Sequence, residues 1–183
     1  MRVRRPTAEE LGAARELTVP DVVASGLQVL FCGINPGLYS AATGCHFARP
    51  GNRFWPALHR GGFTDRVLRP DEQELLLGYG LGVTNIVARA SARADELSVG
   101  ELRDGALRLT KLVQEYRPRV VAVLGISAYR DAFGRREAVI GAQELTIGDS
   151  RVWVLPNPSG LNAHYQLPAL GEEFAALRRA IRE

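Results

Sequence analysis

Three short apolar runs, at residues 27–33, 79–88 and 119–125, do most to restrict the folds open to this chain. The runs at 27–33 and 119–125 lack the alternation of polar and apolar residues that a strand with one wet face shows, so both are expected to be strands covered on both faces. Such strands occur in parallel sheets, where helices connect the strands and pack on the sheet. The chain is therefore expected to have an α/β fold, with a central, mainly parallel sheet of four to five strands in a three-layer α/β/α arrangement.

Helical patterns fill the intervals between these runs. The clearest covers 98–118, where Ser98 and Glu101 have the spacing of a capping box. Thr7 and Glu10 have the same spacing at the start of a first expected helix. Both patterns indicate where a helix begins, because each pairs a hydroxyl with a carboxylate three residues later.

The remaining elements are shorter. A long polar and glycine-rich loop is expected to follow the first strand, and a hairpin is expected at 143–156 with its turn at 148–150. Further helices are expected at 53–62, 70–78, 127–134 and 171–183. We expect a single domain over residues 1–183, with residues 1–25 as an N-terminal helical extension.

Composition limits the classes of function. The net charge is +3 and the pI about 9.2, which permits a nucleic-acid partner without requiring one. The two cysteines and three histidines show no metal-ligand spacing, so neither a metal nor another cofactor is expected. No apolar run approaches the length of a membrane span, and the first ten residues hold no apolar segment for a signal peptide. We expect a cytoplasmic protein with no membrane partner.

Polar residues gather where the expected strands end. The carboxyl ends of parallel strands meet at one edge of a sheet, and binding sites form there. Two of these ends carry an Asn-Pro turn: residues 33–37 read Gly-Ile-Asn-Pro-Gly, and residues 155–160 read Leu-Pro-Asn-Pro-Ser-Gly. One Asn-Pro pair is a common turn signal, but two at separate strand ends can direct amides and backbone N–H groups into one crevice.

Three motifs here resemble those of the mismatch-specific uracil-DNA glycosylases, the bacterial relatives of thymine-DNA glycosylase in the uracil-DNA glycosylase superfamily. They are GINPG at 33–37, GCHFARPGNRFW at 44–55 and LPNPSGLN at 155–162, in the family's order. The resemblance runs from about Val29 to His164. It implies a uracil-DNA glycosylase-like fold and a monomer that acts without a cofactor on double-stranded DNA containing mismatched or damaged bases.

The activity that the resemblance implies is DNA repair by a monofunctional glycosylase. It would hydrolyse the N-glycosidic bond of uracil mispaired with guanine in duplex DNA, with thymine and etheno-type lesions as further candidate bases. Such an enzyme must extrude the nucleotide from the stack, stabilise the departing uracil anion, and present a water to C1′ of the sugar.

Two residues are candidates for the catalytic step. Asn35 resembles the family's water-positioning residue: its amide can orient a water but cannot take the water's proton. The alternative is that Asn35 only forms an Asx turn. Asp95, in the loop after the second strand, departs from the family pattern and is a carboxylate that can act as a base. The alternative is that Asp95 is a solvated residue ahead of a helix.

The resemblance assigns the base-binding pocket to four residues, namely Ile34, Gly37, Phe47 and Asn157. Phe47 would stack on the flipped base, which gives affinity without much discrimination. Its alternative role is a core side chain beneath the long loop. Asn157 stands where faster superfamily members have a histidine, so it can donate a hydrogen bond to the leaving anion but cannot supply charge.

The resemblance also assigns the contacts to DNA. Leu161 would be the apolar wedge that fills the hole left by the extruded nucleotide, with Gly160 and Asn162 bonding to the guanine opposite. Ser159 would bind a phosphate at the kink. Further phosphate contacts are expected from four arginines: Arg89 and Arg93, and also Arg49 and Arg53.

Two other functions stay open on the sequence. The chain could be a catalytically inactive nucleic-acid or nucleotide binding module on the same fold, whose glycine-rich turn cradles a phosphate. It could also hydrolyse free nucleosides. A small-ligand binder has no use for an exposed Leu161, and a nucleoside hydrolase explains neither Leu161 nor the arginines.

Overall fold

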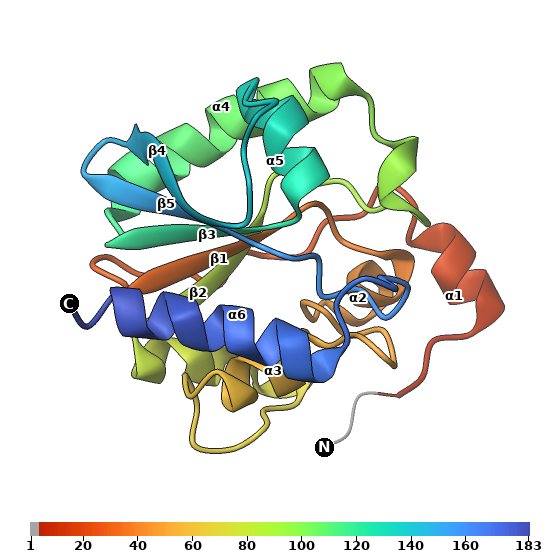
Figure 1. Ribbon diagram of the computed structural model, residues 1–183. Coiled ribbons are helices and arrows are strands. Elements are labelled where there is room, and N and C mark those ends of the chain that lie inside the picture. Colours follow the sequence, from red (N-terminus) through yellow and green to blue (C-terminus); the bar gives the residue numbers. More distant parts are fainter. Residues whose placement is uncertain (1–3) are drawn as a thin grey trace.

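The computed structural model describes residues 4–183, in which helices lie on both faces of a five-stranded sheet (Figure 1). The strands are β1 (Val29–Gly33), β2 (Leu81–Asn85), β3 (Val120–Leu124), β4 (Gly141–Ile147) and β5 (Ser150–Leu155). The α-helices are α1 (Ala8–Ala13), α2 (Leu38–Thr43), α3 (Phe54–Arg60), α4 (Val99–Tyr116), α5 (Ile126–Phe133) and α6 (Leu167–Ala180). Two 3₁₀ helices, η1 (Pro70–Tyr79) and η2 (Ala94–Glu96), complete the elements.

The sheet has the order β2-β1-β3-β5-β4. The four strands β2, β1, β3 and β5 run parallel, and β4 at the edge is antiparallel to β5. In this register Phe31 of β1 lies between Val83 of β2 and Ala122 of β3. The expected three-layer fold with a mainly parallel sheet is confirmed. The carboxyl ends of the four parallel strands therefore meet at one edge.

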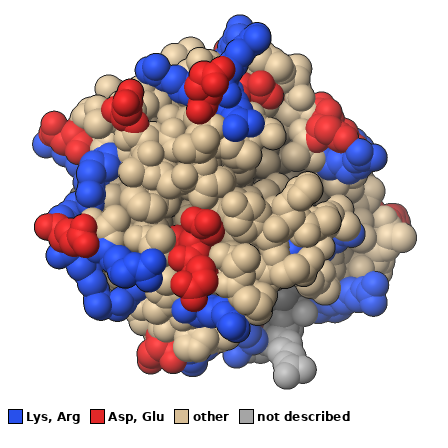
Figure 2. All heavy atoms as spheres, viewed as in Figure 1, with Lys and Arg blue, Asp and Glu red and all other residues tan. Residues whose placement is uncertain are grey.

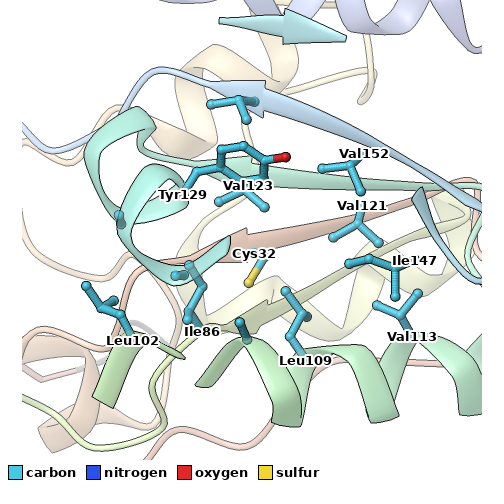
Figure 3. Close-up of a cluster of buried hydrophobic side chains, with 14 of the residues drawn as sticks. Cys32, Ile86, Leu102, Leu109, Val113, Val121, Val123, Tyr129, Ile147 and Val152 are labelled. Carbon is cyan, nitrogen blue, oxygen red and sulfur yellow. The ribbon is translucent and has the colours of Figure 1, made fainter. Parts of the chain in front are cut away.

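Each face of the sheet carries its own apolar core. Every residue of β1, β2 and β3 is buried, and for β1 and β3 the continuous apolar runs predicted this. On one face, Figure 3 shows Cys32 and Val123 of the sheet packed with Leu109 of α4 and Tyr129 of α5. The edge strand β4 instead alternates between exposed and partly buried residues, as a strand with one wet face does.

The opposite face is packed with aromatic rings. The ring centroid of Phe31 lies 5.5 Å from that of Phe54 on α3 and 5.7 Å from that of Phe174 on α6. Neighbouring residues of a strand point to opposite faces, so Phe31 faces α3 and α6 while Cys32 faces α4 and α5. The sheet is thereby fixed from both sides, and its carboxyl edge is a rigid base for a site.

The helix starts match the sequence patterns closely. The capping boxes of Thr7 with Glu10 and of Ser98 with Glu101 are both present, at the starts of α1 and α4. The helix at 171–183 begins earlier than expected, at Leu167, where Pro168 fits the first turn.

The helix expected at 70–78 is present as a 3₁₀ helix, η1. Two local expectations are wrong. The long loop after β1 contains a helix, α2, which ends at Gly44 in the left-handed conformation (φ 69°). The hairpin turn is shorter than 148–150, because Ile147 pairs with Ser150 and leaves only two residues between the strands.

The N-terminal segment lies against the rest of the protein. Ala14, just after α1, is buried in a small apolar cluster with Val19, Ala41 of α2 and Ala90. Residues 1–3 of the expected helical extension lie outside the described residues. No helix within residues 4–183 is both long enough and apolar enough to cross a membrane.

Candidate active site

A cleft of about 340 Å³ opens at the carboxyl edge of the sheet. Its walls come mainly from four segments of the chain, 33–37, 46–52, 91–95 and 157–161, together with Ser40, Asn85 and Leu124. The two Asn-Pro turns therefore border one cavity, as their positions at strand ends predicted. The cleft also contacts the predicted site residues Phe47, Arg93 and Asp95, but not Arg89.

Asn35 is held in one orientation at this cleft. Its Nδ2 donates to the carbonyl oxygen of Arg89 at 3.1 Å and to Ser91 Oγ at 2.8 Å. The carbonyl of Arg89 can only accept, so Nδ2 must face it and the two ends of the amide cannot exchange. Oδ1 makes no hydrogen bond within the described part of the chain and is left as an acceptor at the cleft.

Ser91 joins Asn35 to the segment that carries Asp95. This buried serine accepts from Asn35 Nδ2, and its own hydroxyl donates to the carbonyl oxygen of Arg93 at 2.7 Å. Sequence reasoning missed Ser91. Ser91 could have been predicted as a site residue from its position in the loop after β2, at the same edge of the sheet.

Asp95 borders the same cleft from the short helix η2. Its side chain is 63% exposed and accepts a hydrogen bond from the Arg93 guanidinium. The carboxylate can therefore be reached by a water or a substrate in the cleft. Asp95 is consistent with both interpretations of the sequence, a base or a solvated residue at a helix start.

Phe47 packs on the core and also lines the cleft, so its stacking on a flipped base stays a prediction. Its ring stacks on Phe54 of the core, with centroids 4.2 Å apart and planes 27° from parallel, and it also lines the cleft. Phe47 has a φ of 52°, a left-handed conformation that is unusual for a bulky residue. Backbone strain of this kind persists where the surrounding structure imposes it, and it concentrates at ligand sites.

The loop after β5 presents Leu161 at its tip, where 75% of the side chain is exposed. Leu161 lines the 340 Å³ cleft on one side and a second hollow of about 790 Å³ on the other. Ile34, Asn157 and Ser159 also line both hollows. Leu161 therefore stands on a ridge between two depressions.

Side chains within this loop bond mainly to its own backbone. Asn162 donates from Nδ2 to the carbonyl oxygen of Asn157 at 3.0 Å, and its Oδ1 accepts from His164 N at 3.1 Å. Asn157 Oδ1 accepts from Ser159 N at 3.0 Å, which leaves Asn157 Nδ2 as a donor at the cleft. Ser159 Oγ accepts from Leu161 N at 3.2 Å and keeps its proton to donate. The expected contacts of Asn162 and Gly160 with DNA stay predictions.

The arginines differ in what they bind. Arg89, whose side chain is only 25% exposed, pairs with Glu101 through Nε at 2.6 Å, and its hydrogen bond lowers the pKa of Glu101 to about 2. Arg93 pairs with Asp95. Arg53 bonds to the backbone of the Leu161 loop, and Arg49 is exposed at the cleft. The structure thus gives Arg89 and Arg53 protein partners in place of open solvent, and their expected phosphate contacts stay predictions.

Two buried polar residues at the cleft were missed. Asn85, the last residue of β2, is 5% exposed, and His46 is 2% exposed. His46 Nε2 lies 2.8 Å from the carbonyl oxygen of Pro20, so Nε2 carries the proton and Nδ1 accepts from Asn85 Nδ2 at 3.4 Å. Asn85 could have been predicted from its position at the carboxyl end of a strand, as Asn35 was.

The floor of the cleft has no room for a side chain at Gly33. A Cβ atom there would lie 2.5 Å from Asn85 Oδ1 and 3.3 Å from Phe47 Cζ. Glycine therefore lets the backbone of β1, the amide of Asn85 and the ring of Phe47 meet. Gly37 is different: a Cβ there would meet nothing within 4 Å, and its φ of −72° is ordinary.

Burial lowers the pKa of His46, so this ring is neutral in the folded protein at neutral pH. The unfolded chain takes up a proton near its ordinary pKa, and the folded chain does so only at lower pH. Stability from this residue is therefore present above the unfolded pKa and is lost as the pH falls toward the folded one.

We expect a pH shift from 7.5 to 5.5 to lower the free energy of unfolding of the wild type more than that of His46→Gln. Urea denaturation at the two pH values measures the difference. His59 and His164 are common to both proteins, so they cancel. Equal losses in the two proteins would show that His46 does not resist protonation.

The surface carries charged side chains of both signs (Figure 2). Figure 2 shows basic and acidic side chains interspersed over one face of the molecule. Across residues 4–183 no group of three or more His, Cys, Asp or Glu side chains is placed to hold a metal ion.

Comparison with known proteins gives one family and one fold. The sequence model of the Uracil DNA glycosylase superfamily matches residues 20–182, a span that includes every residue of the cleft. The solution NMR structure of a protein from Methanosarcina acetivorans, described as a "putative Uracil DNA glycosylase", is similar with a TM-score of 0.62. The two chains are 18% identical, and the match covers 92% of this chain and 99% of the other. At this identity the likeness shows a shared fold.

Proposed function

The chain belongs to the uracil DNA glycosylase superfamily, and on this premise we propose that it excises uracil mispaired with guanine from duplex DNA. Membership supports a DNA glycosylase activity with DNA as the substrate. The mismatch-specific, monofunctional type is our proposal, and so is action as a monomer without a cofactor. The observation that carries it is one cleft bordered by both Asn35, with a free acceptor, and Leu161, exposed at a loop tip.

Leu161 would enter the duplex from the ridge between the two hollows. An apolar side chain pushed between base steps offsets part of the cost of unstacking, which is about a few kcal/mol per step. The displaced nucleotide then lies on one side of the ridge, in the 340 Å³ cleft. That volume is at the small end of the range for ligand pockets, as suits a single extruded base.

The extruded uracil would lie against the ring of Phe47. Polar groups at the cleft then bind its edge: Asn157 Nδ2 can donate to the oxygen that gains charge as the base leaves. Asn85 directs Nδ2 at His46, so its Oδ1 is left as an acceptor for an N–H of the base and does not stabilise the anion. The Asn157 amide carries no full charge, so the anion is stabilised by hydrogen bonding alone.

Asn35 Oδ1 would accept a hydrogen bond from the attacking water and direct the water's lone pair to C1′ of the sugar. The new bond joins the water oxygen to C1′ as the bond from C1′ to the base nitrogen breaks. The bonding electrons leave with the uracil anion, and the water's proton passes to Asp95 or to solvent. A carboxylate beside the sugar also stabilises its positive charge.

Phosphate binding would come from groups that line the cleft. The groups there are the Ser159 hydroxyl, the exposed guanidinium of Arg49, and that of Arg93, which also pairs with Asp95. Phosphate contacts from arginine are salt-dependent, so binding should weaken as salt rises.

The test is excision from four labelled substrates: duplexes with U·G, T·G and U·A, and a single strand with uracil. We expect alkali-labile sites in the U·G duplex at enzyme excess, and we expect EDTA not to abolish them. Loss of all activity in EDTA contradicts a metal-independent reaction. Binding to U·G without any alkali-labile site would favour the inactive binding module, and release of base only from free nucleosides would favour the nucleoside hydrolase.

A further inference from the structure

We infer that Arg53 is a positioning residue that holds the loop 158–166 in the shape in which Leu161 meets DNA. This inference rests on the proposed function, because it assigns to Arg53 the task of presenting the wedge. Arg53 is the residue just before α3, and its side chain contacts the backbone of this loop. It belongs to a motif in which an arginine was expected to hold a phosphate.

The guanidinium of Arg53 makes five hydrogen bonds, and all of them go to this one loop. Nη1 donates to the carbonyl oxygens of Ser159 at 3.2 Å, Asn162 at 2.9 Å and Tyr165 at 3.1 Å. Nη2 donates to the carbonyl oxygen of Gly160 at 3.3 Å and to Gln166 Oε1 at 3.1 Å.

These acceptors require a guanidinium. Four backbone carbonyls of one turn point inward to a common centre, and a planar fork with several donors can reach all of them at once. A lysine ammonium has three donors on one atom, so it can satisfy only some of the carbonyls. Carbonyls left without a donor would reorganise the turn toward water, because an unpaired polar group away from solvent is costly.

The loop also rests directly on the backbone beside Arg53. Arg53 N donates to the carbonyl oxygen of Pro158 at 2.8 Å. A Cβ atom on Gly160 would lie 2.6 Å from the carbonyl oxygen of Gly51, so residue 160 packs against the chain at Gly51 without a side chain between them. The loop therefore packs on the segment 51–53.

Arg53 has only neutral hydrogen-bond partners among the described residues. Within residues 4–183 no carboxylate lies within ion-pair distance of it, and its five acceptors are all neutral. Arg53 can therefore act in two ways: its hydrogen bonds fix the shape of the loop, and its positive charge attracts phosphate. Arg53→Lys separates them, because it keeps the charge and loses the fork.

The experiment compares Arg53→Met and Arg53→Lys with Arg103→Met, which removes the charge of an exposed arginine on α4. Single-turnover excision is measured on a U·G duplex and on single-stranded uracil DNA. We expect Arg53→Met to slow duplex excision about 10-fold or more and to change single-strand excision little. We expect Arg53→Lys to restore only part of the duplex rate and Arg103→Met to behave as wild type.

Two results would overturn the inference. Full restoration of the duplex rate by Arg53→Lys would show that only the charge matters. Equal losses on duplex and single strand would show that Arg53 supports the fold as a whole. The double variant Arg53→Met with Leu161→Ala gives a further test: both changes act through the wedge, so it should be little worse than Leu161→Ala alone, and fully additive losses contradict this.

A readout without DNA keeps this inference separate from the proposed function. Amide exchange of residues 160–162 should be faster in Arg53→Met than in the wild type and unchanged in Arg103→Met. Gly160→Ala gives a second route to the same displacement if Arg53→Met folds poorly, because its Cβ meets the Gly51 carbonyl while Arg53 keeps its charge. Unaltered exchange in both variants rejects the bracing role whether or not the protein excises uracil.

Discussion

Asn35→Ala is expected to lower the single-turnover rate of uracil excision from a U·G duplex by about 100-fold or more. Asp95→Asn is expected to lower it as well, by about 10²–10⁴-fold if the carboxylate takes the water's proton. Both variants should still bind the duplex, because Leu161 and the arginines at the cleft are unchanged. Comparing the rates of the two variants shows whether the protein only orients the water or also takes its proton.

The effect of Asn35→Ala follows from the bonds that hold its amide. Nδ2 is bound to the Arg89 carbonyl and to Ser91, so Oδ1 offers the water a fixed acceptor. Alanine removes that acceptor and lets the water rotate, and small losses of alignment at the reacting atom reduce rates strongly. Asp95→Asn keeps the shape of the side chain but removes the charge and the basicity.

The measurement uses enzyme in excess over labelled duplex and follows abasic sites with time. Glu96→Gln is the matched control, because Glu96 is the neighbouring acid in η2 and pairs with Arg15 at 3.1 Å outside the cleft. We expect it to react at the wild-type rate. If Asn35 and Asp95 act on the same water, the double variant should lose less than the product of the two single losses.

Either single variant can contradict part of this mechanism. A wild-type rate for Asp95→Asn would make Asp95 a solvated residue at a helix start and leave Asn35 as the sole water-positioning group. A wild-type rate for Asn35→Ala would show that Asn35 only forms a turn and would leave Asp95 as the one candidate that acts on the water.

Leu161→Ala is expected to reduce excision from the U·G duplex by about 10- to 100-fold while single-strand excision changes little. Burying a leucine side chain is worth about 1.5–3 kcal/mol, and each 1.4 kcal/mol corresponds to about tenfold in rate or affinity. That energy is needed where a nucleotide must be extruded from a stack, and a single strand has less to unstack.

The two substrates are compared at equal enzyme concentration, with binding measured separately from the excision rate. Leu107→Ala is the control, because Leu107 is a leucine of similar exposure on α4, away from the cleft. It should leave both substrates unaffected. Equal losses of Leu161→Ala on duplex and single strand would argue that Leu161 only packs on the loop.

Sequence periodicity was enough to predict the sheet and its covering layers. The runs containing Phe31 and Val121 have no wet face, and a strand without a wet face needs helices on both sides. The helix starts at Thr7 and Ser98 were predictable for a local reason, since a capping box lies within four residues. The helix α2 was not, because six residues after a glycine without a capping side chain give a signal too short to separate from a loop.

The predicted site was incomplete where bonding partners lie far apart in the chain. Arg53 and its acceptors are more than 100 residues apart, and a guanidinium suits a ring of carbonyls as well as it suits a phosphate. His46 and Asn85 are 39 residues apart, and nothing in either local pattern indicates that one fixes the amide of the other. Asn35 was predictable because strand end, turn and amide are contiguous.

Gly33 restricts the order in which this cleft can change by mutation. Any side chain there would press on Asn85 Oδ1 and the Phe47 ring, so the amide of residue 85 must be replaced by something smaller before residue 33 can vary. Asn85 in turn is tied to His46, whose ring orients it. We therefore expect a substitution at Gly33 to be tolerated only together with a change at residue 85, which in turn removes the partner of the His46 ring.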